Sequence, residues 1–281
     1  MIARRCPAVA RVALAPFAAA IVVACSACPG KTTYVRPYKE PTAADVLARL
    51  AERKDKAMSF YAETQMDYWL GDERVNTGVV VMGKRGARIR LQAEMPNGGS
   101  VGSDLACDGV EFRYVDFNRN CQIIGPCTGD SIAQLLHVNH EPDDFLGLAM
   151  GSTPVITDAA GTVTWDASRG YEIVALQSAD GQLQQKIVFD GREARWDVVS
   201  SEVRDRRGDV QWTLDNVKFD TIKDAHGIAL RVPKATHFVQ PSSPEAKKAD
   251  LQVVWKDRKL NLELDAPRFD LQVPPGLPRC P

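Results

Sequence analysis

One pentapeptide has the pattern of a serine nucleophile. The residues Gly98-Gly99-Ser100-Val101-Gly102 match G-x-S-x-G, in which the serine of a hydrolase stands on a sharp turn between a strand and a helix. The surrounding sequence predicts a β-hairpin instead of a strand and a helix, and no histidine is an obvious partner for the hydroxyl. We therefore expect a turn at this position and no nucleophile.

Two further patterns, for phosphate and for metal, are each incomplete. Residues 78–85 (GVVVMGKR) nearly match a P-loop, but Arg85 occupies the place of the Ser/Thr that holds Mg²⁺, and the valine-rich centre predicts a strand. His137 and His140 could present two imidazoles on one helical face, but no third ligand follows at a fixed spacing, and Pro142 begins a new segment. We expect solvated turn histidines, no metal, no cofactor and no enzymatic activity.

The first 24 residues have the pattern of a bacterial secretory signal. Basic residues and no acidic ones precede an uninterrupted apolar stretch at 12–24 (VALAPFAAAIVVA). As a helix, its 13 residues would span about 20 Å, less than the roughly 30 Å hydrocarbon core of a bilayer. The stretch ends Val22-Val23-Ala24-Cys25, which resembles the lipobox of bacterial lipoproteins. We therefore expect residues 1–24 to be removed as a signal peptide.

The lipobox resemblance implies that Cys25 is acylated and anchors the mature chain in a membrane. Two or three acyl chains anchor firmly, because each buried methylene contributes roughly 0.8 kcal/mol. A plain secretory signal is the alternative, and Cys28 is a second candidate for acylation. Ser26 stands where an aspartate retains many such proteins at the inner membrane, so the resemblance implies the periplasmic face of the outer membrane. Residues 25–41, which contain three prolines, are expected to form an extended tether.

Length and charge limit the remaining function classes. The 281 residues include 35 Lys+Arg and 36 Asp+Glu, and 44% of them are hydrophobic. A chain without a surplus of cations is not expected to bind nucleic acid non-specifically, since that binding depends on neutralising phosphates. The length is sufficient for one large domain with its own core.

Beyond residue 42 the sequence predicts mainly β structure. Thr42-Ala43-Ala44-Asp45 has the spacing of a capping box, before one helix that should end near Met58. Two short helices are expected at 130–138 and 142–150. The predicted strands are 59–69, 75–83, 87–94, 101–107, 110–115, 120–124, 162–166, 171–178, 183–189, 195–203, 210–219, 228–238, 250–256 and 259–264. Asp-Gly turns at about ten-residue spacing favour an antiparallel sheet, and no β–α alternation suggests a nucleotide-binding fold.

The order of these elements resembles the LolA/LolB-like superfamily, which contains periplasmic lipoprotein carriers and outer-membrane lipoprotein receptors. The residues that carry the likeness are the helix 43–58, the first strand with Phe60, the strand 78–85 ending in Lys84-Arg85, the Asp108-Gly109 turn before the aromatic strand 110–115, and the close 269–276 (FDLQVPPG). The chain departs from the pattern at Gly86, where the family has proline, and at Val115-Asp116. Residues 240–249 resemble an added loop.

The resemblance implies an α+β, mainly β fold for residues 42–281. It would be one large, curved antiparallel sheet, an open half-barrel, with a few short helices across the concave side. The cavity would take acyl chains of a lipid or lipoprotein, because burial of hydrocarbon contributes roughly 25 cal/mol per Å². The expected lining residues are Val79, Val81, Ile89, Leu91, Phe112 and Tyr114. In the alternative, the helices fill that face, and the chain is a structural or sensor lipoprotein that binds an envelope protein and no lipid.

Arg85 has a role implied by the same resemblance. It stands where the family places an arginine whose hydrogen bonds to the helices across the cavity mouth hold the carrier closed. The planar guanidinium, with five donors and a permanent charge, suits such a latch. A solvated corner arginine is the alternative, because Lys84, Arg88 and Arg90 are close in sequence.

Five cysteines remain if the signal is removed and Cys25 is acylated. They are Cys28, Cys107, Cys121, Cys127 and Cys280. In an oxidising compartment, disulfides are the expected state, and the odd number leaves one cysteine over. A hairpin turning near Phe117 would set Cys107 opposite Cys127, and a short loop closed by Cys121 and Cys127 is the alternative. The spacings match no common zinc site.

Overall fold

The computed structural model describes residues 33–70, 73–95, 98–136, 138, 140–242 and 248–280. The signal peptide predicted at 1–24, Cys25, Cys28 and His137 lie outside these residues.

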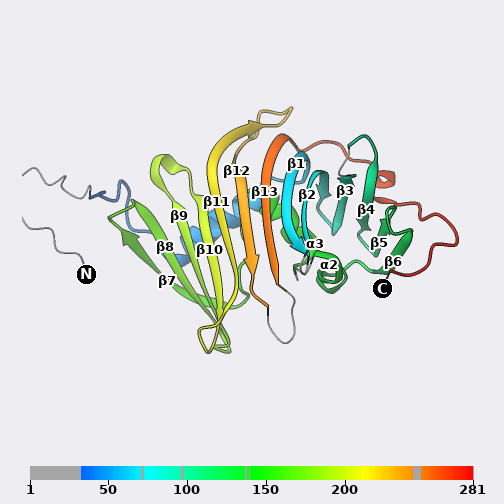
Figure 1. Cartoon of the computed structure of the whole chain (residues 1–281). Coiled ribbons are helices and arrows are strands. Elements are labelled where there is room, and N and C mark those ends of the chain that lie inside the picture. Colours follow the sequence, from blue (N-terminus) through cyan, green and yellow to red (C-terminus); the bar gives the residue numbers. More distant parts are fainter. Residues whose placement is uncertain are drawn as a thin grey trace, which may run out of the picture.

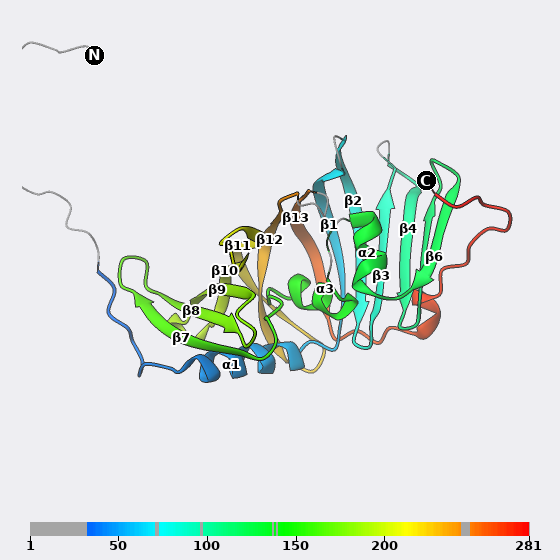
Figure 2. The same cartoon turned by 90° about the horizontal axis from the view of Figure 1, so that it is seen from below.

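Thirteen strands form one antiparallel sheet in the order β6-β5-β4-β3-β2-β1-β13-β12-β11-β10-β9-β8-β7 (Figure 1). Their bounds are β1 Ser59–Leu70, β2 Glu73–Lys84, β3 Arg88–Glu94, β4 Val101–Asp108, β5 Glu111–Asp116, β6 Cys121–Pro126, β7 Ala159–Asp166, β8 Tyr171–Ser178, β9 Leu183–Asp190, β10 Asp197–Asp205, β11 Val210–Lys223, β12 Ala229–Gln240 and β13 Ala249–Leu260. Two meanders, β1–β6 and β7–β13, meet where the first strand pairs with the last. The sheet bends into an arc that stays open, as predicted (Figure 2).

Strand β13 replaces two predicted strands, 250–256 and 259–264. A bulge explains the difference, because Ala62 on β1 pairs with Arg258 while Thr64 pairs with Trp255. The extra residue on β13 interrupts the alternation of inward and outward side chains without ending the strand.

Three α-helices lie on the concave side of the arc: α1 (Ala43–Asp55), α2 (Gly129–Leu136) and α3 (Pro142–Ala149) (Figure 2). The predicted capping box begins α1: the Thr42 backbone N–H donates to Asp45 Oδ2 (2.9 Å) and the Asp45 N–H to Thr42 Oγ1 (3.1 Å). Among the described residues there are also two 3₁₀ turns, η1 (Arg192–Ala194) and η2 (Ala266–Phe269). In the part of the chain that the structure describes, no helix combines the length and apolarity needed to cross a membrane.

Different helices cover different parts of the sheet. Helix α1 buries Val46 and Leu50 against the β8–β10 end, where Val174 and Phe189 are the main partners. Helix α2 covers the other end, with Ile132 packed among residues of β3, β4 and β5. Each fully buried aliphatic or aromatic side chain of this kind contributes about 1.5–3 kcal/mol. The middle of the sheet is left to α3 and the end of α2.

Residues 34–38 belong to the folded body, which corrects the tether predicted for 25–41. The Tyr34 N–H donates to the Ala167 carbonyl (2.7 Å), and Trp165 Nε1–H donates to the Tyr34 carbonyl (3.0 Å). Arg36 Nε lies 2.8 Å from Oε1 of the buried Glu172 on β8. The segment is extended, as the sequence suggests, but it lies against the sheet.

Two disulfides fasten the β4–β6 end, Cys107–Cys127 and Cys121–Cys280. The first is one of the two pairings considered from the sequence, but it does not form across a hairpin. Strand β5 lies between β4 and β6, and the chain returns after β6 so that the Cys127 N–H donates to the Val110 carbonyl (2.9 Å) at the β4–β5 turn. The second disulfide attaches the C-terminal segment to β6, where the Cys280 N–H donates to the Gln122 carbonyl (2.9 Å).

Candidate functional site: an apolar cavity under helices α2 and α3

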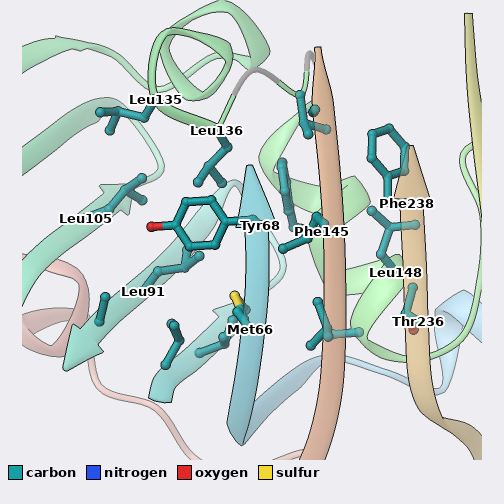
Figure 3. Close-up of a pocket in the computed structure, with 18 of the residues that line it drawn as sticks. Met66, Tyr68, Leu91, Leu105, Leu135, Leu136, Phe145, Leu148, Thr236 and Phe238 are labelled. Atoms are coloured by element: carbon teal, nitrogen blue, oxygen red, sulfur yellow. The ribbon is translucent and has the colours of Figure 1, made fainter. Parts of the chain in front are cut away.

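An apolar cavity lies between the middle of the sheet and the two helices α2 and α3. It has a volume of about 140 Å³, comparable to an engineered apolar cavity of about 150 Å³ that binds benzene. Leu91, Leu105 and Met66 form part of the sheet wall, and Leu136, Phe145 and Leu148 form part of the helical roof (Figure 3). As it stands, the cavity can therefore take a short stretch of hydrocarbon.

The register of the sheet explains why there is room here. One row of inward side chains crosses the strands as Val81, Leu91, Leu105 and Tyr114. In the next row, Val79 pairs with Ala93 and Ala93 pairs with Ser103, so the side chains on β3 and β4 are small. Side chains this short do not reach the roof, so a hollow remains beside the leucines.

Five of the six predicted lining residues line the cavity: Val79, Val81, Ile89, Leu91 and Tyr114. The sixth is a correction. Phe112 lies one row further along, next to Cys107, and is completely buried in the cluster that contains Ile132 of α2. It supports the roof from below instead of facing the hollow.

The sequence interpretation missed the roof and the second half of the wall. Leu135, Leu136, Phe145 and Leu148 come from the helices. The wall also includes residues of β1, such as Met66, and residues of β11, β12 and β13, such as Phe238 and Trp255. Alternation in 228–238 and 250–256 marked those strands as half-buried. The alternation does not indicate that β13 pairs with β1, which is the pairing that brings the residues of β11, β12 and β13 to the cavity.

The polar groups at the cavity are neutral or paired. Burial, with the nearby Asp116 carboxylate as the second cause, raises the pKa of Tyr114 to about 12, and the same two causes raise the pKa of Tyr68. Both phenols therefore stay protonated at neutral pH. Asp250 has His237 Nε2 at 2.8 Å from its Oδ1. Of the described residues, no lysine or arginine lines the cavity, so the site suits uncharged hydrocarbon and not a charged headgroup.

Arg85 is placed differently from the latch that was predicted. Its Nε donates to the Ala57 carbonyl (3.1 Å), and its Nη2 donates to the Lys54 carbonyl and lies 3.1 Å from Asp55 Oδ1. These acceptors belong to the end of α1, which does not line the cavity. The arginine thus stabilises the C-terminal carbonyls of α1, and none of these three acceptors lines the cavity.

Other residues hold the roof. The Ala87 N–H donates to Asp143 Oδ1 (3.0 Å) at the start of α3. At the other end of α3, Arg258 Nη1 donates to the Ala149 carbonyl (3.2 Å) and Arg53 Nη2 to the Met150 carbonyl (3.0 Å). Charged donors at the last carbonyls of a helix are favourable. Helix α3 is therefore fastened at both ends.

In the part of the chain that the structure describes, the serine, phosphate and metal patterns of the sequence form no reactive site. Ser100 is exposed in the connection between β3 and β4, and residues 78–84 are part of strand β2. His140 is buried, which corrects the solvated histidine expected there: its ring lies 5.5 Å from that of Trp212 and 5.4 Å from that of Phe238. Among the described residues no group of three His, Cys, Asp or Glu side chains could hold a metal ion.

Comparison with solved structures shows which known proteins have a similar fold. No protein-family model matches the sequence, and no curated protein matches it. A LolA superfamily protein from Nitrosomonas europaea is similar over 83% of this chain and 99% of its own, with 12% identity and a TM-score of 0.53. A DUF1329 family protein from Desulfovibrio piger is similar over 81% of this chain and 95% of its own, also with 12% identity and a TM-score of 0.53. The likeness confirms the LolA-like fold that the order of sequence elements predicted.

Proposed function

We propose that this LolA-like chain is a lipid-anchored envelope protein that binds an acyl chain of a lipid or lipoprotein without covalent chemistry. The observation that carries the proposal is the apolar cavity beneath α2 and α3, which has no cation in its wall among the described residues. Acylation at Cys25 would hold the protein at the periplasmic face of the outer membrane, where it would act in the transport or reception of lipoproteins. No cofactor and no catalytic group is part of the proposal.

The energetics of the cavity favour a hydrocarbon ligand. Burial of a methylene contributes about 0.8 kcal/mol, so a stretch of about six carbons, the size of benzene in the comparable cavity, contributes roughly 5 kcal/mol before the costs of association. A full acyl chain needs more space than 140 Å³. It would have to move the roof outward at the end of α2, next to Leu136 and Val138.

Two further observations support an envelope location. The chain begins with a secretory-type segment that ends in a lipobox-like sequence. The folded body also contains two disulfides, which persist in oxidising compartments such as the bacterial periplasm.

The test is displacement of a fluorescent fatty acid, together with native mass spectrometry of the protein purified without detergent. Ala93→Phe would place a ring in the row of small side chains and should abolish probe binding. Ala175→Phe is the matched control, because Ala175 is exposed on β8, far from the cavity. Probe binding that Ala93→Phe leaves unchanged would refute the proposal. An empty wild-type protein that binds no probe would favour the structural or sensor alternative.

A further inference from the structure

A charged cleft lies between α1 and the turn that joins β9 to β10, away from the apolar cavity. It has a volume of about 320 Å³ and is lined by five cationic side chains, Arg49, Arg53, Lys56, Arg195 and Arg231, and by two carboxylates, Glu52 and Glu193. Asp197, behind the cleft, pairs with Arg53 (3.5 Å) and Arg231 (2.8 Å). A surplus of two positive charges therefore remains, although the whole chain has a net charge of −1.

The cations on the two sides of the cleft are held in place. The Arg49 guanidinium, on the exposed face of α1, lies 4.7 Å from the ring centre of Trp196. No carboxylate of the described residues forms an ion pair with it. Arg195 pairs with Glu193 at the tip of the turn. A planar guanidinium stacked on an aromatic ring keeps the N–H donors at its edge available for two oxygens of an acceptor such as phosphate.

The turn that carries Trp196 has an unusual backbone. Glu193, Ala194 and Trp196 have φ angles of 54°, 57° and 51°, in the left-handed region that side chains other than glycine rarely adopt. Such a conformation persists only where the surrounding structure holds it. Here Tyr38 packs its ring 5.2 Å from that of Trp196, so the segment that precedes α1 supports the cleft.

The position of this segment connects the cleft with the membrane. The described chain begins at residue 33, and the predicted acylation site is eight residues earlier. An extended chain covers at most about 3.6 Å per residue, so roughly 29 Å separates the anchor from the folded body at full stretch. Val35, with 85% of its surface exposed, lies on the same segment. The end of the molecule that bears the cleft is therefore the end nearest the anchor.

We propose that the cleft binds the phosphate of an anionic phospholipid headgroup in the membrane that holds the chain. Arg49 and Arg195 would contact the phosphate from opposite sides, and Trp196 would lie at the level of the headgroups, where tryptophan is enriched. This site is distinct from the acyl cavity, which has no cation in its described wall, and it does not depend on acyl binding.

The test uses the mature chain, residues 25–281, with Cys25→Ser, so that neither an acyl anchor nor the apolar signal segment contributes. Co-sedimentation is measured with vesicles of phosphatidylcholine alone or with about one third phosphatidylglycerol. We expect binding to the anionic vesicles only, weakened by salt. Arg49→Gln combined with Arg195→Gln should weaken it about thirtyfold, since each cation near an anionic surface contributes about 1 kcal/mol.

The matched control is Arg206→Gln combined with Arg207→Gln, which removes two exposed cations from the β10–β11 turn. That turn lies at the other end of β10, about 27 Å away. It should bind vesicles as the wild type does, and circular dichroism melting should show that all variants fold. Equal loss in both double variants, no loss in either, or no wild-type binding to anionic vesicles would overturn the proposal. Binding of free glycerol phosphate without vesicle binding would also overturn it, in favour of a small-anion site.

Discussion

Arg36→Ala tests whether the segment before α1 is part of the folded body. Glu172 has an exposed fraction of 0%, and Arg36 provides its charged partner, with Nε 2.8 Å from Oε1 and Nη2 3.2 Å from Oε2. Tyr38 lies beside the same carboxylate, and burial followed by the Glu172 charge raises the pKa of Tyr38. The variant would leave a carboxylate buried on β8 without its cation.

The magnitude follows from that burial. Removing one partner of a buried ion pair costs about 3–5 kcal/mol. Because the Arg36 side chain keeps an exposed fraction of 16%, we expect the lower end, a loss of about 3 kcal/mol in the free energy of unfolding. For a domain of this size, that corresponds to a decrease of about 6–12 °C in melting temperature. Glu172→Gln in the Arg36→Ala background should restore part of the loss, since no buried charge then remains.

Thermal and urea unfolding followed by circular dichroism measure the effect. Arg169→Ala is the control, because Arg169 forms an ion pair with Asp166 on the same end of the sheet but has a side-chain exposure of 53%. An exposed pair contributes about 0–1 kcal/mol. If Arg36→Ala costs no more than Arg169→Ala, residues 34–38 are a free tether and the docking described above is wrong.

Four further predictions concern the anchor, the helices, the cavity and the C-terminus. Cys25→Ser should abolish labelling of the chain by radioactive fatty acid and release the protein from membranes. Arg85→Leu should lower the free energy of unfolding by about 1–2 kcal/mol, measured in urea, because the end of α1 loses a charged donor; displacement of the fluorescent fatty acid should not change. Tyr114 has a folded pKa raised to about 12, so its protonated phenol contributes to the free energy of unfolding in full below the unfolded pKa of about 10. This contribution should be lost as the pH rises through 12. Tyr114→Phe should therefore flatten the pH dependence of the free energy of unfolding in urea over this range. Cys121→Ser combined with Cys280→Ser should cost about 2–5 kcal/mol in denaturant unfolding, since the disulfide closes a sequence separation of 159 residues.

Local signals in the sequence were sufficient to predict most of the helices and strands and their order. The Thr42 and Asp45 spacing marks the start of α1 because the two side chains satisfy backbone N–H groups within four residues of each other. Asp-Gly turns such as Asp108-Gly109 mark strand ends, since Gly109 adopts a φ of 105° that other residues rarely adopt. Such information is local, so element order could be predicted without knowing which elements meet.

The missed features all depend on contacts between distant residues. Arg36 and Glu172 are 136 positions apart, and the sequence around either residue does not indicate that they pair. The acceptors of Arg85 depend on where α1 ends relative to the β2–β3 corner. Phe112 has the same inward orientation as Tyr114, but Phe112 is completely buried under α2, whereas Tyr114 is only partly buried and lines the cavity. Alternation identifies the face on which a side chain lies and not what covers that face.

The fastening of α3 explains why the cavity stays open. In a core, small side chains usually let their neighbours collapse into the space, since unfilled volume costs about 24 cal/mol per Å³. For 140 Å³ this corresponds to an upper limit of about 3 kcal/mol. Helix α3 cannot settle toward Ala93 and Ser103 without breaking its bonds to Ala87, Arg258 and Arg53 at its two ends. The hollow is therefore maintained against a cost that a hydrocarbon ligand would remove.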